Sequence, residues 1–181
     1  MLVLLDRDGV INEDRPDFVK NPGELVFIPN SLEAIARLNS HGHKLVVTTN
    51  QSCIGRGIIT EEQLAAIHGK LIEALAKVSG RLDDIIVAPD APWAATDRRK
   101  PGPGMLIEAM RKFNARPGET VMIGDSTRDI EAAGAAGCHR ILVRTGKGRK
   151  TLAEGLGRHL LPVHVADDLD EAADFILAGR F

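Results

Sequence analysis

The first ten residues read MLVLLDRDGV (residues 1–10), an apolar run followed by two acids. Leu2–Leu5 is a continuous apolar run, which is typical of a strand buried on both faces of a parallel sheet. The run stops at Asp6, and a second acid follows at Asp8. Ligands bind at the carboxyl ends of the strands in such sheets, so we expect both acids at a binding edge. Two carboxylates this close repel each other, so a positive group is needed beside them.

Five further apolar runs alternate with segments that carry the start and stop signals of helices. The expected strands, after Leu2–Leu5, are Lys44–Thr48, Ile85–Ala88, Val121–Ile123, Arg140–Val143 and Val163–Ala166. The expected helices are Ser31–Ser40 with Asn30 as its cap, Thr60–Val78 with a capping box, Pro103–Asn114, Thr127–Ala136 and Asp170–Ala178. This alternation predicts an α/β domain over residues 1–181: a doubly wound, mostly parallel Rossmann-like sheet with helices on both faces.

The composition favours a soluble protein without nucleic-acid or membrane partners. Hydrophobic residues make up 44% of the 181 residues and aromatic residues only 3%, so an aliphatic core is expected and base-stacking rings are scarce. The net charge is −2, which gives no attraction to polyanions. Two cysteines are no disulfide framework, and the apolar opening is too short for a signal peptide or a membrane span. We therefore expect a cytoplasmic monomer.

Polar groups follow three more of the expected strands, and together they indicate an active site. They are Thr49-Asn50-Gln51-Ser52, Arg99-Lys100-Pro101 and Gly124-Asp125-Ser126-Thr127-Arg128-Asp129. Each alone is compatible with an ordinary turn, helix cap or solvated surface. All of them, with the Asp6–Asp8 pair, fall at one edge of one sheet, and this coincidence favours a shared catalytic role.

The same motifs resemble those of a known family. The order Asp6-x-Asp8-Gly9, Thr49-Asn50, Lys100-Pro101 and Gly124-Asp125-x-x-x-Asp129 resembles the four motifs of the haloacid dehalogenase superfamily. Over about residues 1–150 the chain is similar to the D-glycero-D-manno-heptose 1,7-bisphosphate phosphatases, and also to their relatives the histidinol-phosphate phosphatases. The resemblance implies a Mg²⁺-dependent phosphatase. The favoured reaction removes the C7 phosphate of the heptose bisphosphate, in the supply of nucleotide-activated heptose for lipopolysaccharide.

The resemblance also implies roles for individual residues. Asp6 would be the nucleophile that forms an aspartyl-phosphate, and Asp8 the general acid and then base, so Asp6 must be ionised while Asp8 carries a proton. Thr49 and Lys100 would hold the transferring phosphoryl group. The Mg²⁺ ligands implied are the Asp6 and Asp125 carboxylates and the Asp8 backbone carbonyl.

Three further groups of residues are expected near the site or beside it. Asp129 is expected either to lie behind the metal ligands or to pair with Lys100. Candidates for substrate binding are Asp14, Asn50, Ser52, Arg56 and Arg99, the last as a bidentate clamp. The basic segment Arg144–Lys150 is interpreted as a solvated loop, with contact to the substrate as the alternative.

Two absences are also expected. Only 40 residues separate Asp8 from Thr49 and 50 separate Thr49 from Lys100, which leaves no room for a separate cap domain. Many relatives carry a structural zinc in the loop that corresponds to residues 88–100. Here Ala88, Asp90, Thr96 and Arg98 stand at the ligand positions, where zinc needs mainly Cys and His. No structural zinc is expected, and Pro89, Pro92, Trp93 and the neighbouring backbone must order the loop.

Alternatives remain open from the sequence. One is a phosphatase of the same branch that acts on histidinol phosphate or another sugar phosphate. Another is a receiver-like phosphoacceptor domain without turnover, although receivers place the accepting Asp after a later strand. A phosphatase for nucleic-acid ends is disfavoured by the missing basic and aromatic groove.

Overall fold

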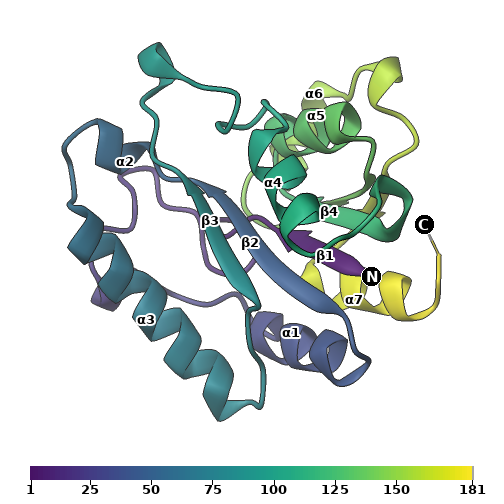
Figure 1. The fold of residues 1–181 in the computed structure, drawn as a ribbon, viewed down its shortest axis with the longest axis horizontal. Helices are drawn as coiled ribbons and strands as arrows, with labels where there is room; N and C mark the ends of the chain where they lie inside the picture. The colour runs from purple at the N-terminus through teal and green to yellow at the C-terminus, as the bar shows by residue number, and fades with distance from the viewer. Residues whose placement is uncertain (181) are drawn as a thin grey trace.

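Six parallel strands form one sheet in the computed structural model, which describes residues 1–180. The order across the sheet is β3-β2-β1-β4-β5-β6, so the chain builds outward on one side of β1 and then crosses to the other (Figure 1). The strands are β1 (Leu2–Leu5), β2 (Lys44–Asn50), β3 (Asp84–Ala88), β4 (Thr120–Gly124), β5 (His139–Val143) and β6 (His164–Ala166). The strand order reverses at β1, and a doubly wound sheet binds its ligand at such a point. The predicted doubly wound parallel sheet is confirmed.

Helices cover both faces of the sheet. They are α1 (Ser31–Ser40), α2 (Ser52–Gly55), α3 (Glu61–Lys77), α4 (Gly104–Lys112), α5 (Thr127–Ala136), α6 (Gly148–Glu154) and α7 (Leu169–Leu177). Short 3₁₀ turns occur at η1 (Pro22–Glu24), η2 (Pro92–Ala94), η3 (Pro117–Glu119) and η4 (Arg158–Leu160). Among residues 1–180, no helix combines the length and the apolar character needed to cross a bilayer.

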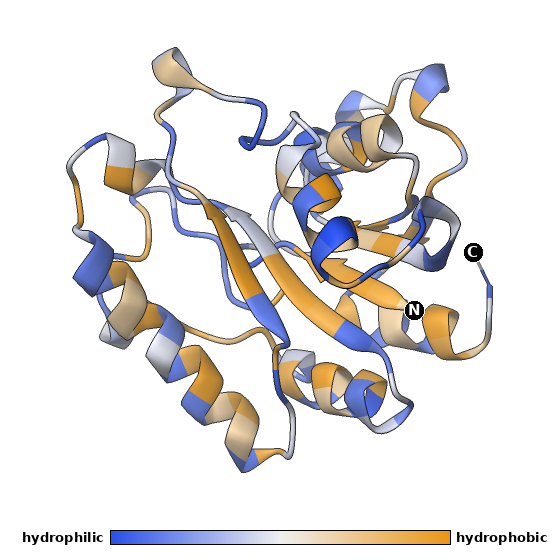
Figure 2. Cartoon of the chain, viewed as in Figure 1, coloured by the Kyte–Doolittle hydropathy of each residue, from blue (hydrophilic) through white to orange (hydrophobic). Residues whose placement is uncertain are grey.

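The alternation of side chains along β1 explains why both faces need helices. Val3 and Leu5 belong to a buried cluster with residues of α1, α3 and α7. Leu2 and Leu4 belong to a second cluster, with residues of α4 and α5 on the opposite face. All four side chains are at most 2% exposed, which requires cover on both sides. Figure 2 shows the strands mainly in the colours of hydrophobic residues, with hydrophilic residues gathered in the loops beyond their ends.

Local sequence signals predicted some helix ends correctly and others wrongly. The capping box of α3 is formed, because Gln63 N donates to Thr60 Oγ1 (3.2 Å) and Thr60 N donates to Gln63 Oε1 (2.9 Å). The predicted cap by Asn30 is wrong: its backbone is left-handed (φ 62°) and its side chain makes no capping hydrogen bond. The short helices α2 and α6 were not predicted, since neither has a long enough apolar repeat.

Candidate active site

A hollow of about 310 Å³ opens at the carboxyl end of the sheet. Its walls come from the loop after β1, from α2 and the segments beside it, from the loop after β3 and from the first turn of α5. Every predicted site residue lines it except Thr49: Asp6, Asp8, Asp14, Asn50, Ser52, Arg56, Arg99, Lys100 and Asp125. The structure therefore brings together residues that are spread over most of the chain.

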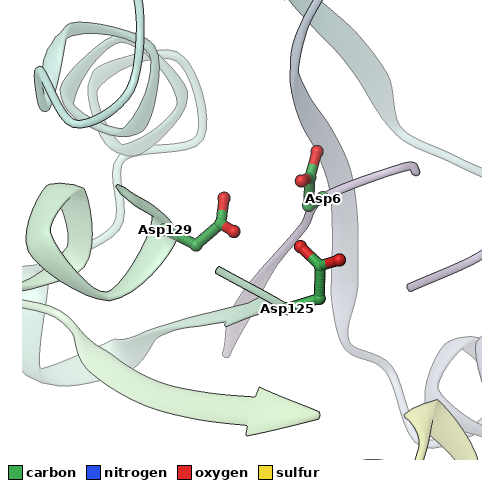
Figure 3. Close-up of side chains that lie close together, drawn as sticks. All are labelled: Asp6, Asp125 and Asp129. Carbon is green, nitrogen blue, oxygen red and sulfur yellow. The ribbon is translucent and has the colours of Figure 1, made fainter. Parts of the chain in front are cut away.

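Three carboxylates converge on the floor of this pocket (Figure 3). Asp6 follows β1, Asp125 follows β4 and Asp129 lies in the first turn of α5, with one oxygen of each within 4.8 Å of the others. The Lys100 ammonium lies 3.1 Å from Asp6 Oδ1 and 2.5 Å from Asp129 Oδ1. When all four groups are charged, three negative charges face one positive charge. The remaining two negative charges suit one divalent cation with oxygen ligands.

Burial and mutual repulsion make two of these acids weak when no metal is bound. Desolvation raises the pKa of Asp6, and so do Asp129 and Asp8. Lys100 opposes the rise, and the result is a pKa of about 6. For Asp125, desolvation and the charges of Asp6 and Asp129 raise the pKa to about 8. A divalent cation placed among them would favour the ionised forms and reverse both shifts. The donor set therefore fits a hard divalent metal ion.

Asp125 is positioned by two glycines and one backbone amide. A Cβ atom at Gly9 would lie 2.1 Å from Asp125 Oδ2, and one at Gly146 would lie 2.2 Å from it. Both glycines also have positive φ angles (87° and 54°), which other residues rarely adopt. Lys147 N donates to Asp125 Oδ2 (2.7 Å), and Thr145 Oγ1 donates to the Gly9 carbonyl (2.7 Å). The segment after β5 thus wraps around the Asp125 carboxylate.

Asp8 is held as a carboxylate by groups that the sequence analysis did not single out. Arg7 Nη2 donates to both Asp8 oxygens (2.8 and 2.9 Å), Asn12 Nδ2 donates to Oδ1 (2.9 Å) and Gln51 Nε2 donates to Oδ2 (2.8 Å). Desolvation raises the pKa of Asp8, but the charge of Arg7 and these hydrogen bonds outweigh it, so the pKa lies below its usual value. Arg7 is only 1% exposed, and its Nη1 lies 3.2 Å from His68 Nε2 of α3.

The order of acidities in this metal-free arrangement is therefore the reverse of the expected one. The sequence analysis expected an ionised Asp6 and a protonated Asp8. Burial instead raises the pKa of Asp6, and the ion pair with Arg7 lowers the pKa of Asp8. Two ligands would restore the expected order. A cation beside Asp6 would lower its pKa, and a phosphate dianion beside Asp8 would raise that of Asp8.

Two predicted contact residues serve mainly to position others. Asn50 holds the backbone of Lys100 with two hydrogen bonds: its Oδ1 accepts from Lys100 N (3.0 Å) and its Nδ2 donates to the Lys100 carbonyl (2.9 Å). Thr49 is 1% exposed and does not line the pocket; its Oγ1 accepts from Gln51 Nε2 (2.9 Å). Lys100 Nζ also donates to the Thr48 carbonyl (2.8 Å). Asn50 and Thr49 thus support the Lys100 backbone and the Gln51 amide.

Arginine side chains also line the pocket. Arg56, Arg99 and Arg128 line it, and none of them forms an ion pair with a carboxylate of residues 1–180. Burial, and then the charges of Arg128 and Arg56, lower the pKa of Arg99, so both other guanidinium groups lie close enough to repel that of Arg99. Arg128 was missed as a candidate, although it lies between the two acids of the fourth motif.

The basic residues of Arg144–Lys150 differ in their surroundings. Lys147 lines the pocket and its Nζ pairs with Asp14 Oδ2 (2.7 Å), so this lysine and a predicted substrate-binding residue close one side together. Arg144 pairs instead with Asp167 (2.5 Å), and Arg149 and Lys150 lie exposed on α6. A run of basic residues does not show by itself which of them lines a pocket.

Side-chain hydrogen bonds order the loop of residues 88–100. The Asp90 carboxylate accepts from Thr96 N (2.7 Å) and from the Thr96 hydroxyl. Arg98 Nη2 donates to the Val87 carbonyl (3.1 Å), and Arg99 Nη1 donates to the Asp90 carbonyl (3.0 Å). The prediction that the prolines, Trp93 and the backbone order the loop is therefore incomplete, because side chains at three of the supposed ligand positions also bridge it.

Comparison with known proteins places this site in a family. The HAD-hydrolase-like family model matches residues 97–172. The D-glycero-beta-D-manno-heptose-1,7-bisphosphate 7-phosphatase of Bordetella bronchiseptica is 43% identical over 178 residues, which is 97% of each chain. The enzyme of the same name from Pseudomonas aeruginosa is 42% identical over 176 residues, again 97% of each chain.

Solved structures give the same result. The crystal structure of the D,D-heptose 1,7-bisphosphate phosphatase from B. bronchiseptica, complexed with magnesium and phosphate, matches with a TM-score of 0.93 and 42% identity over 98% of each chain. The Burkholderia thailandensis enzyme of the same name matches with a TM-score of 0.76 and 42% identity over 98% of each chain. The chain therefore belongs to the haloacid dehalogenase-like hydrolases, and within them to the phosphatases of the D-glycero-D-manno-heptose-1,7-bisphosphate 7-phosphatase family.

Proposed function

We propose that this phosphatase removes the C7 phosphate of D-glycero-D-manno-heptose 1,7-bisphosphate in the supply of nucleotide-activated heptose for lipopolysaccharide. The observation that carries the proposal is that one pocket holds two sets of groups suited to phosphate. The acidic cluster with Lys100 suits a metal ion and the phosphoryl group that is transferred. Arg56, Arg99 and Arg128 have no carboxylate partner within residues 1–180 and suit a second phosphate. A substrate with two phosphates uses both sets.

The proposed mechanism has two steps. The Asp6 carboxylate attacks phosphorus, an Asp6–phosphorus bond forms, and the bond from phosphorus to the sugar oxygen breaks while Asp8 gives its proton to that oxygen. In the second step Asp8 takes a proton from the water that attacks the aspartyl-phosphate, which releases inorganic phosphate and regenerates Asp6. Lys100 and Thr49 are proposed to stabilise the phosphoryl group in both steps, Lys100 by its charge and Thr49 through its backbone or the Gln51 amide.

Mg²⁺ is the proposed cofactor. The Asp6 and Asp125 carboxylates and the Asp8 backbone carbonyl would hold it, and when bound it supplies positive charge that offsets the charge of the phosphoryl oxygens. We further propose that the chain acts as a single capless domain, as a monomer in the cytoplasm, without nucleic-acid or membrane partners.

A screen of phosphorylated metabolites tests the proposed function. We expect the highest kcat/KM for the heptose 1,7-bisphosphates, with both anomers included, and ³¹P NMR should show that the product keeps its C1 phosphate. Histidinol phosphate should be a poor substrate, because its cationic amine would face three guanidinium groups. A higher kcat/KM for histidinol phosphate or for a sugar monophosphate would overturn the proposal in favour of another activity of this branch. A single stable phosphoryl equivalent without turnover would favour the receiver-like alternative.

The affinity for Mg²⁺ is expected to depend steeply on pH. Without metal, Asp125 has a pKa of about 8 and Asp6 one of about 6, so Mg²⁺ must displace a proton below pH 8 and a second one below pH 6. Acid therefore weakens binding: between pH 8 and pH 6 the affinity should fall about tenfold per pH unit. Isothermal titration calorimetry at pH 6, 7 and 8 measures this. A constant affinity over that range would show that Asp125 is not a ligand.

The absence of structural zinc remains a prediction. The side chains of Asp90, Thr96 and Arg98 are already engaged in hydrogen bonds within the loop, and zinc would need mainly Cys and His. Elemental analysis of protein purified without chelators should find less than about 0.1 zinc per chain. One zinc per chain that survives dialysis would refute the prediction.

A further inference from the structure

The side chain of Arg56 lies close to two aromatic rings, and Arg56 itself lines the pocket. Its Cζ atom is 5.1 Å from the centre of the Trp93 ring and 6.0 Å from that of the Phe18 ring. Phe18 belongs to the loop after β1, Arg56 follows α2, and Trp93 belongs to η2 in the loop after β3. In Figure 1 this last loop rises beyond the carboxyl end of the sheet, at the end where α2 lies. Phe18 and Arg56 line the pocket.

Trp93 is exposed, so packing in the core does not explain its place. Its side chain is 73% accessible, the highest value among the large hydrophobic residues that are exposed in residues 1–180. A large aromatic ring left in water beside a ligand pocket is a sign of a binding role. Stacking on a guanidinium uses the ring face without burying it.

Close packing at Gly55 fixes the distance between the Trp93 loop and Arg56. A Cβ atom at Gly55 would lie 2.6 Å from the Pro89 carbonyl oxygen and 2.7 Å from Ala91 N. Gly55 N also donates to the Pro89 carbonyl (3.0 Å). The end of α2 thus rests directly on the base of the loop, and Arg56 is the next residue.

Arg56 needs such a support because of its neighbours. Arg99 and Arg128 carry the same charge and line the same pocket. Repulsion between Arg99 and Arg56 favours an Arg56 side chain that turns out into solvent. A carboxylate partner would hold Arg56 but cancel its charge, whereas aromatic faces hold a guanidinium and leave the charge available for an anion.

We propose that Trp93, together with Phe18, is a positioning residue that holds Arg56 over the pocket and so makes the enzyme selective for substrates with a second phosphate. The inference rests on the proposed function for its substrate class. Trp93 acts through Arg56 and takes no part in the transfer of the phosphoryl group at Asp6.

Steady-state kinetics of Trp93→Ala test the proposal. The measured quantity is the selectivity, defined as kcat/KM for the heptose 1,7-bisphosphate divided by kcat/KM for p-nitrophenyl phosphate. It should fall about twofold to fivefold, the range of one exposed cation–π contact, through a higher KM for the bisphosphate. Trp93→Phe keeps an aromatic face and should recover most of the selectivity. Ile72→Ala removes another exposed hydrophobic side chain, on α3 and outside the pocket, and should leave the selectivity unchanged.

A double-mutant cycle separates this role from general damage to the loop. In an Arg56→Ala background, Trp93→Ala should cause no further loss of selectivity, because the group that it positions is gone. An undiminished loss in that background, or a Trp93→Ala enzyme with wild-type selectivity, would overturn the inference. If the wild-type enzyme does not hydrolyse the bisphosphate at all, the proposed function fails instead, so the two failures are distinct.

Fluorescence gives a readout independent of turnover. Trp93 is the single tryptophan of the chain, so all tryptophan emission reports on this position. In the Asp6→Asn protein with Mg²⁺, the heptose bisphosphate should change the emission, and p-nitrophenyl phosphate should change it much less after correction for its absorbance. The change should disappear in Asp6→Asn/Arg56→Ala. Emission that responds equally with and without Arg56 would contradict a Trp93–Arg56 unit.

Discussion

Replacing Asp6 by Asn is expected to lower kcat by at least about 10⁴-fold, with the fold intact. The amide cannot form the aspartyl-phosphate, and it also removes one carboxylate from the cluster with Asp125 and Asp129. The fold should persist because Lys100 keeps its partner Asp129 at 2.5 Å and its hydrogen bond to the Thr48 carbonyl. Phosphate release measured with the heptose bisphosphate checks the loss, and circular dichroism checks the fold.

Asp84→Asn is the matched control for this substitution. Asp84 begins β3, at the end of the strand opposite the pocket, and pairs with Lys112 at 2.7 Å on the surface. The same chemical change there should leave kcat within about twofold and stability within about 1 kcal/mol. Substantial Mg²⁺-dependent turnover by Asp6→Asn would refute Asp6 as the nucleophile, whatever the control gives.

The sheet could be predicted because each strand is a short apolar run that carries its own signal. Leu2–Leu5 has no polar residue, so the sequence alone indicates burial on both faces, and the two core clusters confirm it. The position of the acids followed from the same argument, since strand ends in a parallel sheet share one edge. Strand ends were less certain: β2 continues to Asn50, two residues beyond its predicted end, because polar Thr49 and Asn50 still pair with β3.

The surroundings of each acid could not be predicted from such signals. Arg7 stands between the two acids in sequence, yet nothing local shows that its side chain is buried and turned onto Asp8. His68 reaches Arg7 only because α3 packs on that face of the sheet, which is a long-range contact. Gly9 and Gly146 come from opposite parts of the chain and meet at one Asp125 oxygen. These contacts depend on tertiary packing, so no pattern along the sequence predicts them.

Replacing Lys100 by Met should remove both activity and stability. The ammonium is 1% exposed and lies within 3.1 Å of Asp6 and 2.5 Å of Asp129, so its loss leaves buried carboxylates without a counter-charge. Breaking such a pair from one side costs about 3–5 kcal/mol of unfolding free energy. Loss of the cation that faces the phosphoryl group should lower kcat by about 10²–10³-fold. Urea denaturation with EDTA, together with phosphate-release kinetics, measures both effects.

The exposed pair of Lys112 and Asp84 provides the control for the buried one. Lys112 is 57% exposed, and its ammonium lies 2.7 Å from the Asp84 carboxylate, a distance similar to that between Lys100 and Asp129. Water screens the surface pair, so Lys112→Met should cost less than about 1 kcal/mol and leave kcat unaltered. Equal losses for the two lysines would mean that the burial of Lys100 has no energetic consequence.

A second substitution decides what Asp129 does. Asn can still accept the hydrogen bond that Asp129 Oδ2 takes from Ser126 N (3.1 Å), so Asp129→Asn removes a charge and keeps the cap of α5. If Asp129 is the partner of Lys100, then Lys100→Met/Asp129→Asn should recover at least about 1–2 kcal/mol relative to Lys100→Met, without any recovery of activity. In that case Asp129→Asn alone should bind Mg²⁺ almost as tightly as the wild type. No recovery of stability, combined with an affinity for Mg²⁺ lowered by much more than the roughly 100-fold that loss of a residue behind the ligands can cause, would instead make Asp129 a direct metal ligand.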